Sequence, residues 1–400
     1  MTWSPRSTKP VWLMALLTGV AAVVGYLLNE FAPPTPPSTP GSTPEPPRFF
    51  GWVHDPEAVE AVARQLPCPN FRQTEAYQAP YDGPDDVFLW EACRKVTGDL
   101  LPPRNQGSVG SCVSFGTASA IEHLICVQIV SGNREEYRDL AQEVIYGGSR
   151  VEVGGGRIRG DGSVGAWAAK FVQDWGVVPR GIHGPHDLTR YDERRCREYG
   201  QRGVPADLHP LARQHPVRTV ANVRSWDECQ AAIRNGYPIA VCSSQGFSMR
   251  RDAEGFCRPQ GTWMHCLAIV GVKGGARPGA FLLNSWGPSA HSGPRGAGDP
   301  SPAGFWVDAA TVDRMLRQGD SWAFSSFVGF PARKLDWFAR GAGPSRRNAQ
   351  SLSNPLSSML RSFAKLYGQA ASITHNLGGF HDDAVDLAFA DRAQTSGAGR

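Results

Sequence analysis

The chain has 400 residues, of which 41% are hydrophobic and 20% charged, and its formal net charge is +4. That length provides ample material for a hydrophobic core in one large or two small domains. The charge is mild and the arginines are scattered, which argues against a nucleic-acid-binding surface, so we expect no nucleic acid among its partners. Nine cysteines without a C-x-x-C pair argue against a zinc ribbon or thioredoxin motif, and they fit either one free thiol beside disulfides or a fully reduced protein.

The N-terminus carries a candidate membrane segment. Residues 1–10 are polar and basic, and residues 11–28 follow without a single charge. A helix of that length comes close to spanning a bilayer core of ~30 Å, with Trp12 and Tyr26 near its two ends. We predict a transmembrane signal anchor with residues 1–10 in the cytoplasm and the rest of the chain outside it. A cleaved signal peptide, which would give a secreted protein, is the alternative.

Residues 31–47 form a candidate linker, because Pro, Thr and Ser dominate the stretch and proline lacks the backbone donor that helices and sheets need. We expect a stiff, extended and solvated spacer. Residues 48–100 form an N-terminal extension, in which the pattern predicts a short helix at 57–65 and a loop at 82–86.

The stretch from Asn105 to Phe115 combines a glycine-rich loop with the start of a helix predicted at 111–130. Gln106 precedes Cys112 by six residues, and Cys112 stands at the junction of loop and helix. A helix N-terminus carries partial positive charge and unpaired N–H groups, which favour the nucleophilic thiolate over the thiol. The N–H of Cys112 and the side-chain amide of Gln106 could together hold a developing oxyanion.

After this helix the pattern predicts two further helices and a long loop. The helices are expected at 134–145 and at 163–174, the second with Ser163 as its N-cap and Gly176 as its end. Residues 181–216 are rich in Arg, His and Pro and are expected to form a surface loop. Their histidines match no metal-ligand spacing, so we predict no metal site and no cofactor.

From residue 217 the periodicity becomes that of strands. Strands are predicted at 217–223, 238–243, 265–272, 281–285, 304–307 and 322–328. A capping box from Ser225 to Glu228 and a stop at Gly236 define a short helix between the first two strands. Helices first and strands later predict an α+β fold.

Two of these strands carry residues with chemical potential. His265 begins one apolar run, and Asn284 ends another. A cysteine nucleophile needs an imidazole to take up its proton, and the imidazole needs a third group to fix its tautomer and orientation. Cys112, His265 and Asn284 supply these parts. An isolated cysteine is usually only a small buried hydrophobic residue, so the combination of the three residues is what indicates catalysis.

On these motifs, residues 101–332 resemble the papain-like cysteine peptidases, the family that includes papain and the cathepsins. The resemblance implies that Gln106 belongs to the oxyanion hole and that Cys112 is the nucleophile. It also implies that His265 is the base and that Asn284 orients it. The implied fold has two lobes, one helical and one β-barrel-like, with the active-site cleft between them.

The resemblance also assigns substrate-binding residues. Trp286 matches the indole that shields the His–Asn hydrogen bond, and Cys266, next to the base, is expected to shape a pocket. The glycine-rich loop is expected to present its backbone to an extended peptide, although a flexible surface loop is an equal alternative. The loop residues concerned are Gly160, Asp161, Gly162 and Ser163. The sequence departs from the family at Val109 and Val113, where a half-cystine and a tryptophan usually stand.

We therefore predict a membrane-anchored cysteine-type peptidase, specifically an endopeptidase, whose partners are protein or peptide substrates. One alternative is a catalytically inactive papain-fold binding module tethered to the membrane, and another is a Cys–His hydrolase such as a cell-wall amidase. The family usually carries a helical inhibitory prosegment; residues 48–100 are short for that role, and whether they inhibit is left open. Residues 333–400 are expected to form a C-terminal extension with an amphipathic helix and disordered flanks.

Overall fold

The computed structural model describes residues 50–215 and 217–335. The predicted membrane segment at 11–28, the linker at 31–47 and the C-terminal helix lie outside the described residues. Within them, one helix, Cys112–Val130, is long and apolar enough to cross a membrane. Because 78% of its most apolar window is buried inside the fold, we interpret it as a core helix.

Helices and antiparallel strands are both present, so the predicted α+β class is confirmed. The described α-helices are α2 (Pro56–Ala63), α3 (Glu75–Gln78), α4 (Trp90–Thr97), α5 (Cys112–Val130), α6 (Gln142–Gly148), α7 (Gly165–Asp174), α8 (Glu193–Arg202), α9 (His209–Ala212), α10 (Trp226–Arg234) and α11 (Ala309–Leu316). The described strands are β1 (Val87–Phe88), β2 (Ile182–His183), β3 (His186–Asp187), β4 (Thr219–Asn222), β5 (Ile239–Phe247), β6 (Pro259–Lys273), β7 (Gly279–Leu283), β8 (Gly304–Asp308) and β9 (Ser321–Ser325).

The principal sheet has the strand order β4-β9-β5-β6-β7-β8, with β1 added beside β6, and its pairings are antiparallel. We call β4 to β9 the sheet lobe. Its central pair of strands, β5 and β6, aligns Cys242 with Cys266 and Ser243 with His265. Strand β6 begins at Pro259, so His265 lies inside a long strand rather than at the start of a short one.

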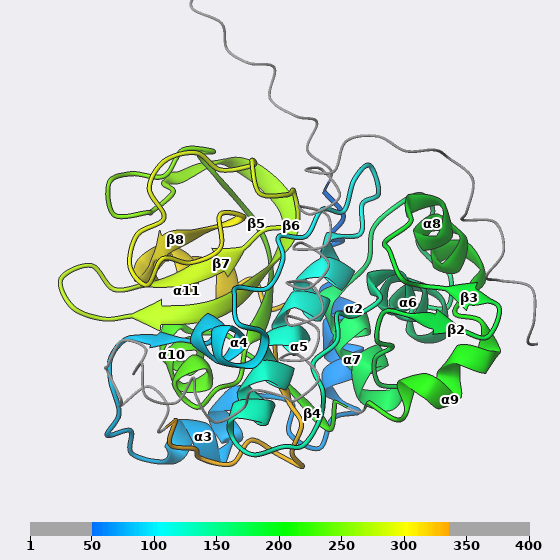
Figure 1. Cartoon of the computed structure of the whole chain (residues 1–400), viewed down its shortest axis with the longest axis horizontal. Helices are drawn as coiled ribbons and strands as arrows, with labels where there is room; N and C mark the ends of the chain where they lie inside the picture. Colours follow the sequence, from blue (N-terminus) through cyan, green and yellow to red (C-terminus); the bar gives the residue numbers. More distant parts are fainter. Residues whose placement is uncertain (1–49, 216, 336–400) are drawn as a thin grey trace, which may run out of the picture. The chain divides into compact units, whose positions relative to one another are not determined.

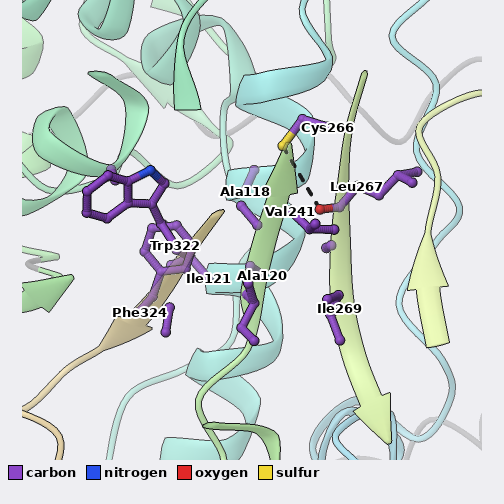
Figure 2. Packing of buried hydrophobic residues seen from close by; sticks show 14 of the residues in the cluster. Ala118, Ala120, Ile121, Val241, Cys266, Leu267, Ile269, Trp322 and Phe324 are labelled. Atoms are coloured by element: carbon purple, nitrogen blue, oxygen red, sulfur yellow. Dashed lines mark hydrogen bonds between the residues drawn. The ribbon is translucent and has the colours of Figure 1, made fainter. Parts of the chain in front are cut away.

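Helix α5 lies between the sheet lobe and a group of helices, α6, α7 and α8, which we call the helical lobe (Figure 1). On the sheet side, Ala118 and Ile121 of α5 pack with Val241 of β5 and Ile269 of β6 (Figure 2). Most of the helix is buried on every face, which is why it reads as uniformly apolar rather than amphipathic. Its N-terminus is thereby fixed rigidly between the two lobes.

Several predicted boundaries are wrong for reasons visible in the packing. The helix expected at 134–145 begins only at Gln142, because the preceding backbone turns to pair Leu140 with Pro179 and with the carboxylate of Glu122. The loop expected at 181–216 contains the hairpin β2–β3 and helix α8, whose N-cap is Asp192. Residues that look like loop by composition are therefore folded against the helical lobe.

Other boundaries are confirmed. Helix α10 is capped by the hydroxyl of Ser225, which accepts from the N–H of Glu228 at 3.3 Å, as the capping box predicts. Helix α7 ends before Gly176, which has a φ of +88° that favours glycine. The predicted N-cap of α7, Ser163, is wrong by one residue, because Val164 is the N-cap.

Candidate active site

The imidazole of His265 is held by the amide of Asn284. Nε2 of His265 lies 2.9 Å from Oδ1 of Asn284, and the backbone N–H of Ser285 donates to the same oxygen at 2.8 Å. Strand β6 carries the histidine, and the asparagine directly follows its neighbour β7, so the sheet register brings them together. The ring of Trp286 lies over the imidazole at a centroid distance of 4.5 Å and helps to exclude water.

A second histidine, His291, contacts the other end of the same amide. Nδ2 of Asn284 lies 3.1 Å from Nε2 of His291, which is only 3% exposed. The sequence does not mark this residue as part of the site, because it follows Asn284 by seven positions in a loop rich in glycine and proline. No helical or strand period marks that loop, so only the fold reveals the contact.

Cys112 is the first residue of α5 and is fully buried. Backbone groups of Cys266, Gly51 and Val113 lie near its sulfur and act to lower the pKa of the thiol, against the larger effect of burial. Because Cys266 directly follows His265 in β6, the thiol lies against the strand that carries the imidazole. The structure therefore brings together two stretches that are far apart in the sequence.

Burial favours the neutral form of both groups in this arrangement. Burial raises the pKa of Cys112 above its usual range, and the neighbouring backbone groups only partly offset that effect. Burial also lowers the pKa of His265 to about 4, against the opposing effect of its bond to Asn284. In this covered state, burial therefore outweighs the tendency of a helix N-terminus to favour the thiolate of Cys112.

Gln106 connects the cysteine loop to the asparagine segment. Its Oε1 accepts from the hydroxyl of Ser285 at 2.6 Å, and its backbone N–H donates to the carbonyl of Ser285 at 2.8 Å. Its Nε2 donates to the carbonyl of Val109 at 2.8 Å. The three sequence motifs therefore meet in one place, with the Gln106 amide fixed between them.

An extended segment of the chain itself covers this site. We call residues 50–53 the strap. The N–H groups of Gly51 and Trp52 lie 3.1 and 3.0 Å from the carbonyl of Met264, which directly precedes His265. On the other side, Val53 N–H donates to Ser163 at 2.9 Å and Ser163 N–H donates to Gly51 at 2.8 Å. The strap thus joins the helical lobe to the sheet lobe across Cys112.

Two side chains fix the strap. Trp52 is 3% exposed, and its indole N–H donates to the buried carboxylate of Asp320 at 2.8 Å. The ring of Phe50 lies 6.1 Å from that of His265 and 5.8 Å from that of Trp286, measured between centroids. At Gly51 a Cβ atom would overlap the carbonyl group of Gly110, so only glycine fits where the strap crosses the cysteine loop.

The glycine-rich loop is ordered rather than free. Its Ser163 backbone pairs with the strap, in the manner expected for an extended peptide, and Asp161 accepts from Gly110 N–H at 3.0 Å. The carbonyls of Gly160 and Gly162 accept from the guanidinium of Arg150. These contacts also explain why α7 begins late, since the backbone of Ser163 is already paired as a strand.

The cysteines are free thiols at all nine positions, each of which lies in the described part of the chain. Two of them, Cys242 and Cys266, lie opposite each other beside Cys112, and both are buried. The predicted pocket residue Cys266 therefore lies beneath the strap and touches the candidate nucleophile.

No family model matches the chain, and no curated protein matches it by sequence. Among solved structures it is similar to xylellain, a cysteine protease from Xylella fastidiosa, with 17% identity over 70% of this chain and 92% of that one and a TM-score of 0.43. It is similar to digestive procathepsin L2 proteinase from Tenebrio molitor larval midgut, with 16% identity over 80% and 95% of the two chains and a TM-score of 0.43.

A third similar structure is proCathepsin B S9 from Trypanosoma congolense, with 12% identity over 71% of this chain and 87% of that one and a TM-score of 0.43. These three solved structures are thus a cysteine protease and two procathepsins.

Proposed function

We propose that the chain is a cysteine-type peptidase in which Cys112 is the nucleophile, His265 the base and Asn284 the orienting residue. The observation that carries this proposal is the hydrogen bond from His265 to Asn284 on the strand that also contacts the sulfur of Cys112. Nδ1 of His265 has no hydrogen-bond partner among the described residues, although it is buried. An unpaired ring nitrogen is the atom that could exchange a proton with a nearby thiol.

In the proposed reaction, the thiol proton of Cys112 moves to His265, and the thiolate so formed attacks the carbonyl carbon of a peptide bond. The oxyanion that forms accepts from the N–H of Cys112 and from the amide of Gln106, which its bond to Ser285 holds in place. His265 then protonates the leaving amine, and water attacks the acyl-enzyme to return the thiol. Asn284 Oδ1 stabilises the imidazolium throughout.

We further propose that the structure is the closed, inactive state of this peptidase. The strap uses the same Ser163 and Met264 backbone groups that an extended peptide would use, and it covers the sulfur. A neutral thiol beside a neutral imidazole is unreactive, because the thiolate is the nucleophile. Turnover therefore requires the strap to withdraw, after which water can restore the ordinary pKa values of both groups.

The direct test is Cys112→Ala in the full chain. The wild type should hydrolyse a fluorogenic peptide and react irreversibly with an epoxide thiol inhibitor, and the variant should do neither while keeping its melting temperature. Cys229→Ala, which removes a buried thiol from α10, is the matched control and should keep both activities. Peptide hydrolysis that survives Cys112→Ala would exclude the assignment.

The covered cleft also favours a second candidate, an inactive binding module in which the strap permanently fills the groove. That protein would show no epoxide labelling even when the strap is loosened by mutation.

Anchoring of the domain outside the cytoplasm by residues 11–28 is part of the first proposal. It is tested by membrane fractionation and protease protection of intact cells, in which a soluble or protected domain would contradict it.

A further inference from the structure

The amide of Asn284 has to be held one way round for the proposed reaction. Its Oδ1 accepts from His265 and from the N–H of Ser285, while its Nδ2 lies against His291. The oxygen and nitrogen of an asparagine amide have nearly the same shape, so hydrogen-bond partners alone decide which atom faces which neighbour. At a 4% exposed residue, water offers little help with that choice.

We propose that His291 is a positioning residue for this amide, an inference that rests on the proposed peptidase function. With Nε2 unprotonated, the ring of His291 accepts a hydrogen bond from Nδ2 of Asn284 and leaves Oδ1 directed at His265. A flipped amide would place two donors against each other at His265, because both the amide NH2 and the imidazolium Nε2–H donate.

The surroundings of His291 suit this tautomer. Nδ1, which then carries the proton, lies 3.9 Å from the sulfur of Cys257, a weak acceptor. The ring packs on that of Phe305 at 4.5 Å between centroids. Phe305 belongs to β8, so the imidazole rests on the sheet lobe rather than on a mobile surface.

The loop that carries His291 is fixed by a buried guanidinium. Arg251, 5% exposed, donates to the carbonyl of His291 at 2.9 Å and also to those of Gly293, Pro302 and Gly304. Its carbonyl partners lie on both sides of the loop and at the start of β8. Arg251 at the backbone carbonyl and Cys257 at the ring are a charged and a titratable neighbour of His291.

The experiment compares His291→Phe with His291→Gln in the full chain. Phenylalanine keeps the ring volume but cannot accept, whereas the glutamine oxygen can take the place of Nε2. We expect His291→Phe to lower kcat about tenfold, which corresponds to the free energy of one orienting hydrogen bond, and to leave KM little changed. We expect His291→Gln to have kcat and KM values close to those of the wild type. His186→Phe, at a histidine paired with Asp207, is the control that should change nothing.

The pH profile separates positioning from simple structural damage. Since Asn284 raises the pKa of His265, its loss of orientation should lower that pKa. The alkaline limb of kcat/KM should therefore move to lower pH in His291→Phe and stay in place in His291→Gln. An unchanged limb in His291→Phe, or an equal loss in both variants together with a lower melting temperature, would overturn the inference.

A measurement that does not depend on turnover distinguishes a failure of this inference from a failure of the proposed function. Spectra of ¹⁵N-labelled histidine should show a changed ring environment for His265 in His291→Phe and an unchanged one in His291→Gln. If the wild type proves inactive, the peptidase proposal fails while these spectra still decide the inference. Identical His265 signals in the wild type and in His291→Phe would refute it.

Discussion

Replacing Trp52 with alanine should open the strap. The indole is almost completely buried and donates to Asp320 in the closed state, and it would be exposed to water in an open one. The substitution therefore penalises only the closed state. Truncating a buried tryptophan costs about 3 to 5 kcal/mol, so even the lower value would raise the ratio of open to closed protein by roughly 100-fold.

The assay is the second-order rate at which an epoxide inhibitor labels Cys112, measured with the inhibitor well below saturation. We expect Trp52→Ala to be labelled about 100-fold faster than the wild type, until the strap is open most of the time. Helix α2 should keep the strap tethered, because Val59 and Val62 remain buried in the core.

The matched control is Phe71→Ala, which removes another buried ring. Phe71 packs on Tyr237 and Phe330, and among the described residues no backbone hydrogen bond or aromatic ring contact joins either of these to the strap. This variant should lower the melting temperature by a comparable amount without accelerating labelling at temperatures well below the melting transition. Equal labelling rates in the wild type and Trp52→Ala would refute the view that the strap controls access to the thiol.

Three further predictions concern the same site. Gly51→Ala should also accelerate epoxide labelling, because the added methyl group overlaps the carbonyl group of Gly110; an unchanged rate would show that the strap does not cross there. Asn284→Ala should lower kcat about 10- to 100-fold through loss of a hydrogen bond to a charged imidazole, and a normal kcat would remove Asn284 from the mechanism. Acid should favour the open strap. The pKa of His265 is lowered to about 4 in the closed state, whereas an exposed imidazole has a pKa of about 6.5. The stability of the closed state is therefore lost as the pH falls from about 6.5 towards 4. Hydrogen exchange at the Trp52 amide measures this opening, and exchange that slows on acidification beyond the intrinsic rate would contradict it.

The sequence was sufficient to predict the parts of the site that depend on local pattern. A thiol after a glycine-rich loop and before an apolar run predicted the start of α5 to within a residue. The predicted histidine lies on β6 and the predicted asparagine directly follows the neighbouring strand β7, so the two are within hydrogen-bond distance. These features depend on short spacings, which a single sequence records directly.

The features that were missed depend on contacts distant in sequence. The indole of Trp52 reaches a carboxylate that follows it by 268 positions, and no local pattern at residues 50–53 signals that contact. His291 is likewise significant only because the loop after Asn284 folds back on it. The effect of burial on Cys112 has the same origin, since a helix N-terminus favours a thiolate only where the site is not desolvated.

Strap closure and the ionisation of the site are one coupled equilibrium. Burying Cys112 and His265 together beneath the strap disfavours charge on both, so the closed state holds a neutral pair. Conversely, any condition that stabilises the thiolate and imidazolium must favour withdrawal of the strap by the same free energy. A peptide that displaces residues 50–53 would therefore meet a nucleophile that becomes reactive as the cover leaves. The hydrogen bond that His265 donates to Asn284 raises the pKa of His265 and contributes most when the imidazole is charged, so the orienting amide stabilises the open state more than the closed one.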